Sequence, residues 1–156
     1  MTDRRSVASK VLGEHITFVR TAEETDGELL EMEAIYAANQ SWETMLPHAH
    51  PLQEETFEVL EGTLTVELQG EQHIYKEGDR FVVPRGVAHA MRNFGAVPAR
   101  MRWQVRPALQ SQQFYEAALP AADRGALADP ARIQALLQAF PDIFHLVAQP
   151  TLVDGE

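Results

Sequence analysis

The fold of this chain is decided by the segment PHAHPLQEETFEVLEG, residues 47–62, and by the segment GDRFVVPRGVAHAMRN, residues 78–93. In the first segment His48 and His50 stand at positions i and i+2 of an extended stretch, so their side chains point to the same side. Two imidazoles placed in this way can bind one metal ion. Glu55 follows at the head of the next strand and offers a carboxylate oxygen. In the second segment, a turn containing Pro and Gly delivers His89 to the start of another strand.

These two segments resemble the two signature motifs of the cupin superfamily. The first motif reads His-x-His, four residues, Glu, six residues, Gly, and it is matched by His48, His50, Glu55 and Gly62. The second reads Gly, five residues, Pro-x-Gly, two residues, His, three residues, Asn, and it is matched by Gly78, Pro84, Gly86, His89 and Asn93. The resemblance covers residues 47–93 directly and, through the strand pattern, residues 29–106. With its helical tail the chain is also similar to small single-domain bacterial cupins.

One position departs from the family pattern. The first motif usually opens with a Gly six residues before its first His, and this chain has Trp42 there. That Gly serves a turn and does not bind the metal, so the departure concerns the loop that enters the motif.

The resemblance implies a jelly-roll barrel, or double-stranded β-helix, with one metal ion in its interior. The implied ligands are His48, His50, Glu55 and His89. Glu55 would take a catalytic role if it acted as a general base beside the metal. Glu54 is close enough to compete as the carboxylate ligand, but the spacing to Gly62 favours Glu55. Three neutral imidazoles and one carboxylate suit a divalent transition metal (Fe, Mn, Ni, Zn or Cu) and do not suit Ca²⁺, which prefers oxygen ligands.

Short runs of alternating apolar and polar residues surround the motifs, separated by turns with Gly or Pro. This pattern predicts an all-β fold of many short strands. In one run Leu30, Met32, Ala34 and Tyr36 share a face, and the glutamates between them share the other. The expected strands are His15–Arg20, Leu29–Ala37, Thr56–Leu60, Thr63–Leu68, Gln72–Lys76, Arg80–Val83, His89–Phe94 and Ala99–Arg106.

The pattern becomes helical after Pro107. Asp129 fits an N-cap and Pro130 a first helical position, and apolar residues then recur with helical spacing up to Phe140; a shorter helix is expected over Ser111–Leu119. We therefore expect an N-terminal arm over residues 1–14, a barrel over residues 15–107 and a C-terminal helical extension over residues 108–156. The helices would cap the barrel or pack on its outer face. A lid or a dimer contact is the alternative.

Composition limits the partners and the location of the protein. The formal net charge of −10 disfavours nucleic acids and anionic membranes, which bind basic surfaces. No apolar run is long enough to span a bilayer, and the first ten residues lack the apolar region of a signal peptide. The absence of cysteine excludes disulfides and thiolate metal sites and suits the cytoplasm. We expect a cytoplasmic homodimer, because jelly rolls leave sheet edges that must be covered.

The other candidate residues have weaker contexts. His15, His73 and His145 are interpreted as ordinary surface or packing residues. Arg85 and Arg92 flank the second motif and could face an anionic ligand, although solvent is favoured. Six large side chains alternate as a barrel interior would require, and those nearest the metal would form an apolar wall for a substrate. They are Met32, Tyr36, Phe57, Met91, Met101 and Trp103.

The first functional hypothesis is a metal-dependent, dioxygenase-like enzyme that acts on a small apolar or aromatic molecule. Four protein ligands leave one or two positions open on the metal, where water, O₂ or a substrate can bind. One alternative is a cupin that binds a metal or a small ligand without turnover. Another is a sugar or sugar-phosphate isomerase or epimerase, which would need basic residues in the pocket. The fold itself does not decide among them.

Overall fold

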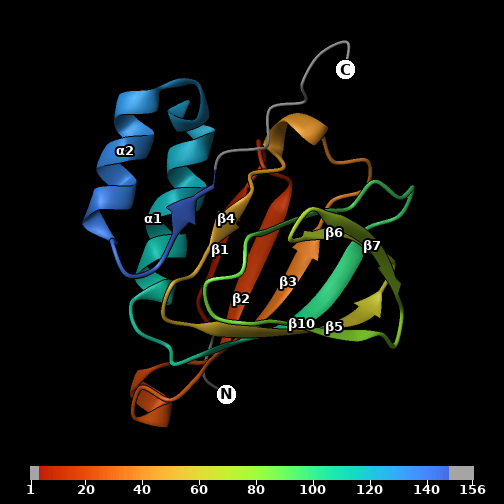
Figure 1. Cartoon of the computed structure of the whole chain (residues 1–156), viewed down its shortest axis with the longest axis horizontal. Coiled ribbons are helices and arrows are strands. Elements are labelled where there is room, and N and C mark those ends of the chain that lie inside the picture. Colours follow the sequence, from red (N-terminus) through yellow and green to blue (C-terminus); the bar gives the residue numbers. More distant parts are fainter. Residues whose placement is uncertain (1–3, 148–156) are drawn as a thin grey trace.

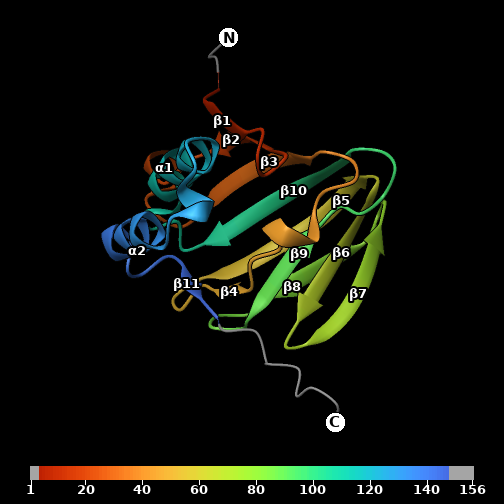
Figure 2. The same ribbon diagram turned by 90° about the horizontal axis from the view of Figure 1, so that it is seen from above.

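Two β-sheets and two α-helices make up the structure, a computed structural model that describes residues 4–147 (Figures 1 and 2). Within that range the larger sheet contains, in spatial order, β1 (Ser6–Ser9), β2 (Glu14–Arg20), β3 (Leu30–Tyr36), β10 (Ala99–Arg106), β5 (Glu54–Glu61) and β8 (Arg80–Val83). The smaller sheet contains β11 (His145–Leu146), β4 (His48–Ala49), β9 (His89–Arg92), β6 (Thr63–Leu68) and β7 (Glu71–Lys76). The helices are α1 (Ser111–Asp123) and α2 (Pro130–Ala139).

The expected jelly-roll fold is confirmed, but the expected closed barrel is not formed by the described residues. The two sheets remain separate, with β1 and β8 at the edges of one and β11 and β7 at the edges of the other. Strands β7 and β8 follow each other through a turn at Gly78 and lie in different sheets. The fold is therefore a sandwich of two sheets that leaves an end for the helices to cover.

Each of the eight expected strands is present, three of them (β6, β8 and β10) with the expected bounds. Three further short strands, β1, β4 and β11, were not among them. Strand β1 lies in the stretch expected as an N-terminal arm and pairs with β2. Because short edge strands such as β1 are defined by their partners more than by a repeating apolar pattern, their sequences give little signal.

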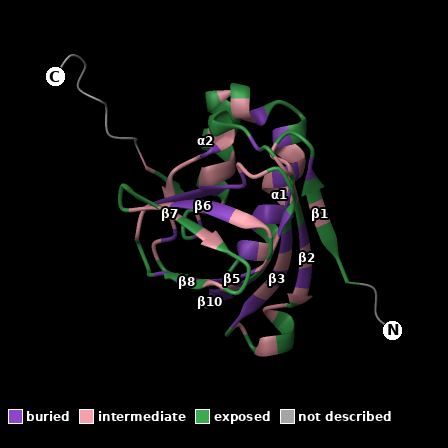
Figure 3. Cartoon of the chain, turned by 90° about the vertical axis from the view of Figure 1, so that its right-hand side faces the viewer, coloured by how far each residue is buried: buried purple, intermediate pink, exposed green. Residues whose placement is uncertain are grey.

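The core lies between the two sheets. Along β3, Leu30, Met32, Ala34 and Tyr36 are buried and the residues between them are less so, as the alternation predicted. Leu64 and Val66 on β6 are fully buried as well, and Figure 3 shows buried stretches on the sheets and on α1. Each such large apolar side chain contributes roughly 1.5–3 kcal/mol by leaving water.

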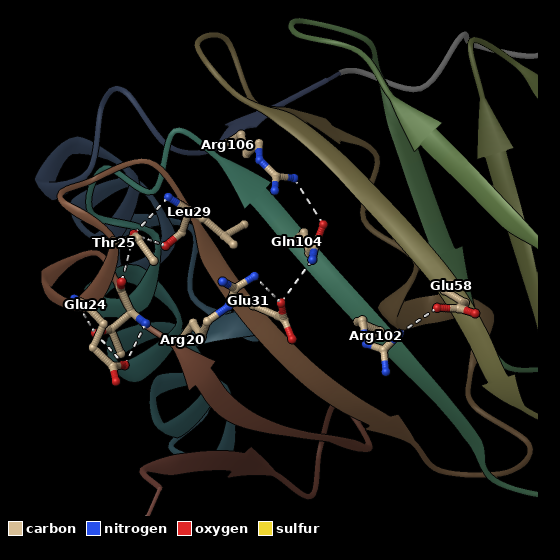
Figure 4. Close-up of polar contacts among 10 residues, drawn as sticks. Arg20, Glu24, Thr25, Leu29, Glu31, Glu58, Arg102, Gln104 and Arg106 are labelled. Carbon is tan, nitrogen blue, oxygen red and sulfur yellow. Dashed lines mark hydrogen bonds and ion pairs between the residues drawn. The ribbon is translucent and has the colours of Figure 1, made fainter.

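The outer face of the larger sheet is polar. Arg20 and the amide of Gln104 each donate a 3.0 Å hydrogen bond to Oε1 of Glu31, and Arg102 donates a 2.8 Å bond to Glu58 (Figure 4). Pairs at this level of exposure add less than about 1 kcal/mol each. Their main effect is to make this face of the sheet a polar surface that is exposed to solvent.

Two motif residues have structural roles. Gly62 has a φ of 77°, and a Cβ at this position would lie 2.6 Å from the carbonyl oxygen of Pro98, so glycine is required. The amide of Asn93 donates hydrogen bonds to the carbonyl oxygens of Ala37 and Val97, at 3.2 and 2.8 Å. Both residues close loops beside the sheets and do not contact the histidines.

The helices cover the open end of the sandwich. Asp129 caps α2 by accepting a hydrogen bond from the backbone N–H of Arg132, and Pro130 is the first helical residue, as expected. Helix α1 continues beyond Leu119 to Asp123, with Pro120 inside it. Its residues Phe114 and Tyr115 belong to the buried core. No helix among the described residues is long and apolar enough to cross a membrane.

Candidate metal centre

Three histidines from the two motifs lie side by side at one end of the smaller sheet. His48 on β4 is directly opposite His89 on β9, and His50 follows two residues after His48. One ring nitrogen from each lies within 4.8 Å of the others. His50 and His89 are almost completely buried, and His48 is partly exposed. The structure thus brings together the three histidines that the motif spacing selected.

Glu55 completes this cluster from the larger sheet. Its Oε1 lies 3.2 Å from Nε2 of His50 and 3.0 Å from Nε2 of His89. Its side chain is 1 % exposed, whereas the neighbouring Glu54 is exposed to solvent. Of the two glutamates that could compete for the role of ligand, Glu55 is the one beside the histidines.

Each histidine is oriented by its other ring nitrogen. The Nδ1 atoms of His48, His50 and His89 lie 2.7, 2.6 and 3.0 Å from the backbone carbonyl oxygens of Leu46, Ile143 and Val87. A carbonyl only accepts, so each Nδ1 carries a proton, and in the neutral form of each ring the lone pair lies on Nε2. This is the arrangement by which metal-binding histidines are normally held.

The buried atoms at the centre could bind a cation. Nε2 of His50, Nε2 of His89 and Oε1 of Glu55 have no hydrogen-bond partner within the described part of the chain. An imidazole lone pair and a carboxylate 3.0 Å apart repel each other in a buried site unless a proton or a metal ion lies between them. Three imidazole nitrogens and one carboxylate oxygen are donors that fit a divalent transition metal.

The charges in the cluster are strongly coupled. Burial, together with the neighbouring rings of His89 and His50, holds the pKa of His48 well below its ordinary value. Burial alone would lower the pKa of His50, but the Glu55 carboxylate raises it overall. Burial would likewise raise the pKa of Glu55, yet His50 and His89 hold that pKa well below its ordinary value. Glu55 is therefore a carboxylate, and His48 a neutral imidazole, as metal ligands must be.

A further contact fixes the carboxylate of Glu55. The indole Nε1 of Trp103, on β10, donates a 2.8 Å hydrogen bond to Oε2 of Glu55, inside the core. The sequence pattern placed Trp103 in the interior but gave no sign of this bond, because the pairing of β10 with β5 becomes visible only in the fold.

A segment near the end of the described chain holds the other side of the cluster. The ring of Phe144 stacks on His48 with centroids 4.1 Å apart, and the carbonyl of Ile143 accepts the bond from His50. Strand β11 pairs with β4, the strand that carries His48. Sequence reasoning missed these contacts, since a backbone carbonyl and a two-residue strand leave no signature in the sequence.

A cavity of about 160 Å³ borders His48, Glu55 and His89. Its wall is mainly apolar and comes from both sheets and from the C-terminal helices. Of the six large side chains expected in the interior, Tyr36, Phe57, Met91 and Trp103 line this cavity. Met32 and Met101 are buried in the core instead.

The expectation that Arg92 faces solvent is wrong. Arg92 is buried, forms a 2.7 Å ion pair with Glu14 and donates a 2.9 Å hydrogen bond to the carbonyl of Leu12. Burial raises the pKa of Glu14, although Arg92 opposes the shift. Arg92 is buried because the turn before β2, in the stretch expected as an arm, folds over the end of β9. Arg85 is exposed, as expected.

The remaining candidate positions lie outside the cluster. His15 and His145 are exposed, and the side chain of His73 is 42 % exposed. Trp42, which replaces the usual Gly, begins a short 3₁₀ turn (Trp42–Thr44) and stacks on Phe94 with centroids 4.2 Å apart. The departure from the family pattern thus lies in the loop before β4, outside the histidine cluster.

Comparison with known protein families gives one domain match. The family model described as Cupin domain matches residues 36–105, which include all four residues of the cluster.

A partial relative is also found. Tetracenomycin polyketide synthase protein TcmJ from Streptomyces glaucescens is 34% identical over 65 residues, which make up 42% of this chain and 44% of that protein. The match therefore spans less than half the length of this relative.

Solved structures share the fold. An RmlC-like cupin from Shewanella frigidimarina NCIMB 400 superposes with a TM-score of 0.58 at 18% identity, covering 70% of this chain and 89% of the other. KdgF from Halomonas sp. gives a TM-score of 0.56 at 20% identity, covering 71% and 91%. At these identities the similarity shows the fold alone.

Proposed function

We propose that this chain, whose residues 36–105 match the cupin domain model, holds one divalent transition metal ion on His48, His50, Glu55 and His89. The observation that carries the proposal is the convergence of three oriented Nε2 atoms and one buried carboxylate oxygen. The test is metal analysis of protein purified without chelators. One Fe, Mn, Ni, Zn or Cu ion per chain is the expected result.

The proposed activity is that of a dioxygenase-like enzyme acting on a small apolar or aromatic molecule. A redox-active ion on four protein ligands would have one or two open positions and would supply the O₂ chemistry. The chain's own residues would bind the substrate against an apolar wall, exclude water and keep the carboxylate of Glu55 fixed. The cavity beside the cluster supports this proposal.

O₂ uptake separates this proposal from its alternatives. Iron-loaded protein should consume O₂ only when an apolar or aromatic substrate is present. Zinc-loaded protein should not consume O₂ with any such substrate, because zinc has no redox chemistry. Equal turnover with zinc would indicate Lewis-acid chemistry such as isomerisation or epimerisation. No turnover with either metal would favour a metal- or ligand-binding protein without activity, in which Glu55 serves only as a ligand.

The cavity wall disfavours a sugar-phosphate substrate. A phosphate would need free cationic groups. Among residues 4–147, Arg92 is the one Lys or Arg residue that lines the cavity, and it is paired with Glu14. The isomerase alternative is therefore less well supported than the oxygenase-like one.

For assembly we propose a cytoplasmic homodimer. Its support is the set of open sheet edges at β1, β8, β7 and β11 and the absence of cysteine. Light scattering at micromolar concentration should give twice the chain mass of 17.5 kDa. A monomer mass would contradict the dimer.

A further inference from the structure

The C-terminal extension supplies about half of the wall of the cavity beside the histidines. These residues lie outside the part of the chain that matches the cupin domain model. They come from α1, from the turn after it, from α2 and from the segment that follows. They are Phe114, Tyr115, Ala118, Leu119, Ala122, Ala126, Leu127, Ile133, Leu136, Leu137, Phe144 and Leu146.

The extension is attached to the cluster at both of its ends. At its start, the amide of Gln53, two residues before Glu55, donates hydrogen bonds to the carbonyl of Pro107 and to the hydroxyl of Ser111, both at 2.8 Å. Near the end of the described chain, Phe144 stacks on His48 and also on Phe114, with centroids 4.1 and 4.9 Å apart. The helical wall is therefore held in a fixed position relative to the histidines.

The composition and size of the wall favour small apolar ligands. Its side chains are almost all apolar, and alanines on and after α1 leave the space that larger residues would fill. An engineered cavity of roughly 150 Å³ lined by Leu, Ile and Phe binds benzene. The present cavity, of about 160 Å³, has a similar size.

The charged groups on the wall are already balanced. In the described part of the chain they are Glu14 and Arg92, which pair with each other, and Glu55, which faces two histidines. A charged ligand would lose its hydration without gaining a free partner among these side chains, and a cation would in addition be repelled by the proposed metal ion. An uncharged ligand would lose little.

We propose that the C-terminal extension is the specificity element of the site, and that it selects an uncharged apolar ligand about the size of a single aromatic ring. The proposal rests on the proposed function, because it takes this cavity as the substrate pocket. It assigns the choice of ligand to α1 and α2 and the binding of the metal to the cupin motifs.

Two neighbouring alanines on α1 give a matched test. Ala118 lines the cavity and Ala117 does not. Leucine and alanine both favour helices, so Ala118→Leu and Ala117→Leu should each preserve α1. Thermal unfolding of both variants checks this. Toluene is the neutral probe and benzylamine, a cation at neutral pH, is the charged one, and ligand-observed NMR titration gives their dissociation constants.

The Kd for toluene should rise at least about tenfold in Ala118→Leu, because the added side chain occupies the space of the ligand, and should stay within about twofold in Ala117→Leu. Wild-type protein should bind benzylamine more weakly than toluene. Unchanged toluene binding in Ala118→Leu, equal losses in both variants, absence of toluene binding to wild type, or benzylamine binding as tight as toluene would overturn the proposal.

Metal content measured on the same samples keeps the two proposals apart. Both variants should retain the metal content of the wild type, because neither residue is a ligand. If no sample contains metal but toluene binding still responds to Ala118→Leu, the metal proposal fails and the specificity element stands. If metal is present and toluene binding does not change in Ala118→Leu, the metal proposal stands and the specificity element fails.

Discussion

The indole Nε1 of Trp103 donates a 2.8 Å hydrogen bond to Oε2 of Glu55, while Oε1 of the same carboxylate lies 3.0 Å from Nε2 of His89. The two oxygens thus have separate tasks. One is fixed by a neutral donor, and the other remains directed at the histidines. Trp103 is therefore a positioning residue, which acts on the candidate metal through Glu55.

Replacing Trp103 by Phe removes this donor and keeps most of the apolar ring. Metal affinity should fall about 10- to 100-fold, as is typical when a residue that orients a ligand is lost. A competition titration with a chelator measures the change. Trp42→Phe, at an exposed position outside the cavity wall, is the control and should bind metal as the wild type does. Equal affinity in Trp103→Phe and wild type would show that the bond does not position the ligand.

The adjacent glutamates give a second matched pair. Glu55→Gln removes a buried carboxylate beside two imidazoles and should lower metal affinity and alter metal preference, because an amide is a neutral and weaker ligand. Glu54→Gln changes an exposed side chain and should leave both unchanged. The measurement is a set of titrations with Fe(II), Mn(II), Ni(II) and Zn(II). A loss confined to Glu54→Gln would place the carboxylate ligand one residue earlier.

Phe144 should govern how long the metal stays bound. Phe144→Ala removes the ring stacked on His48, so that ligand becomes more mobile and more accessible to water. We expect the metal to transfer to an excess of chelator several times faster than from wild type. Ile74→Ala, on the exposed side of β7, is the control for loss of an apolar side chain. An unchanged transfer rate would mean that the stacking has no part in retaining the metal.

Asp123 should make stability depend on pH. Its carboxylate accepts hydrogen bonds from the backbone of Val11 at 3.0 Å and from the hydroxyl of Ser9 at 2.8 Å, and these bonds lower its pKa. A carboxyl whose pKa is lower in the folded state stabilises the fold above its unfolded pKa of about 3.9 and loses this effect as the pH falls through the folded value.

The difference in unfolding free energy between wild type and Asp123→Asn should therefore be constant from pH 7 to about pH 5 and shrink below about pH 4. Urea unfolding at a series of pH values measures it. A difference that is independent of pH down to pH 2.5 would show that the charge of Asp123 does not matter to the contact.

The strands could be predicted because they depend on local spacing, whereas the convergence of the four motif residues was expected from the resemblance to the cupin motifs. Histidines at i and i+2 share a side of any extended stretch, and the alternation along β3 requires one buried face. A match of both motifs also suggested which strands would meet.

Other features depend on contacts between distant parts of the chain. The bond from His50 to the carbonyl of Ile143 joins residues 93 positions apart and involves a backbone atom that every residue type possesses. Arg92 is buried because the turn at Leu12 folds over it, and β1 was not recognised as a strand. The jelly-roll fold was expected from the family and is confirmed, but its two sheets are not joined by hydrogen bonds into a closed barrel within the described residues.

The central claim, a metal held by the motif histidines, is tested most directly by metal analysis of protein purified without chelators. Wild type should contain one divalent transition metal ion per chain, and His48→Ala, His50→Ala and His89→Ala should each lose most of it. His73→Ala and His145→Ala, outside the cluster, should retain it. Full metal occupancy in a variant that lacks all three motif histidines would contradict the account.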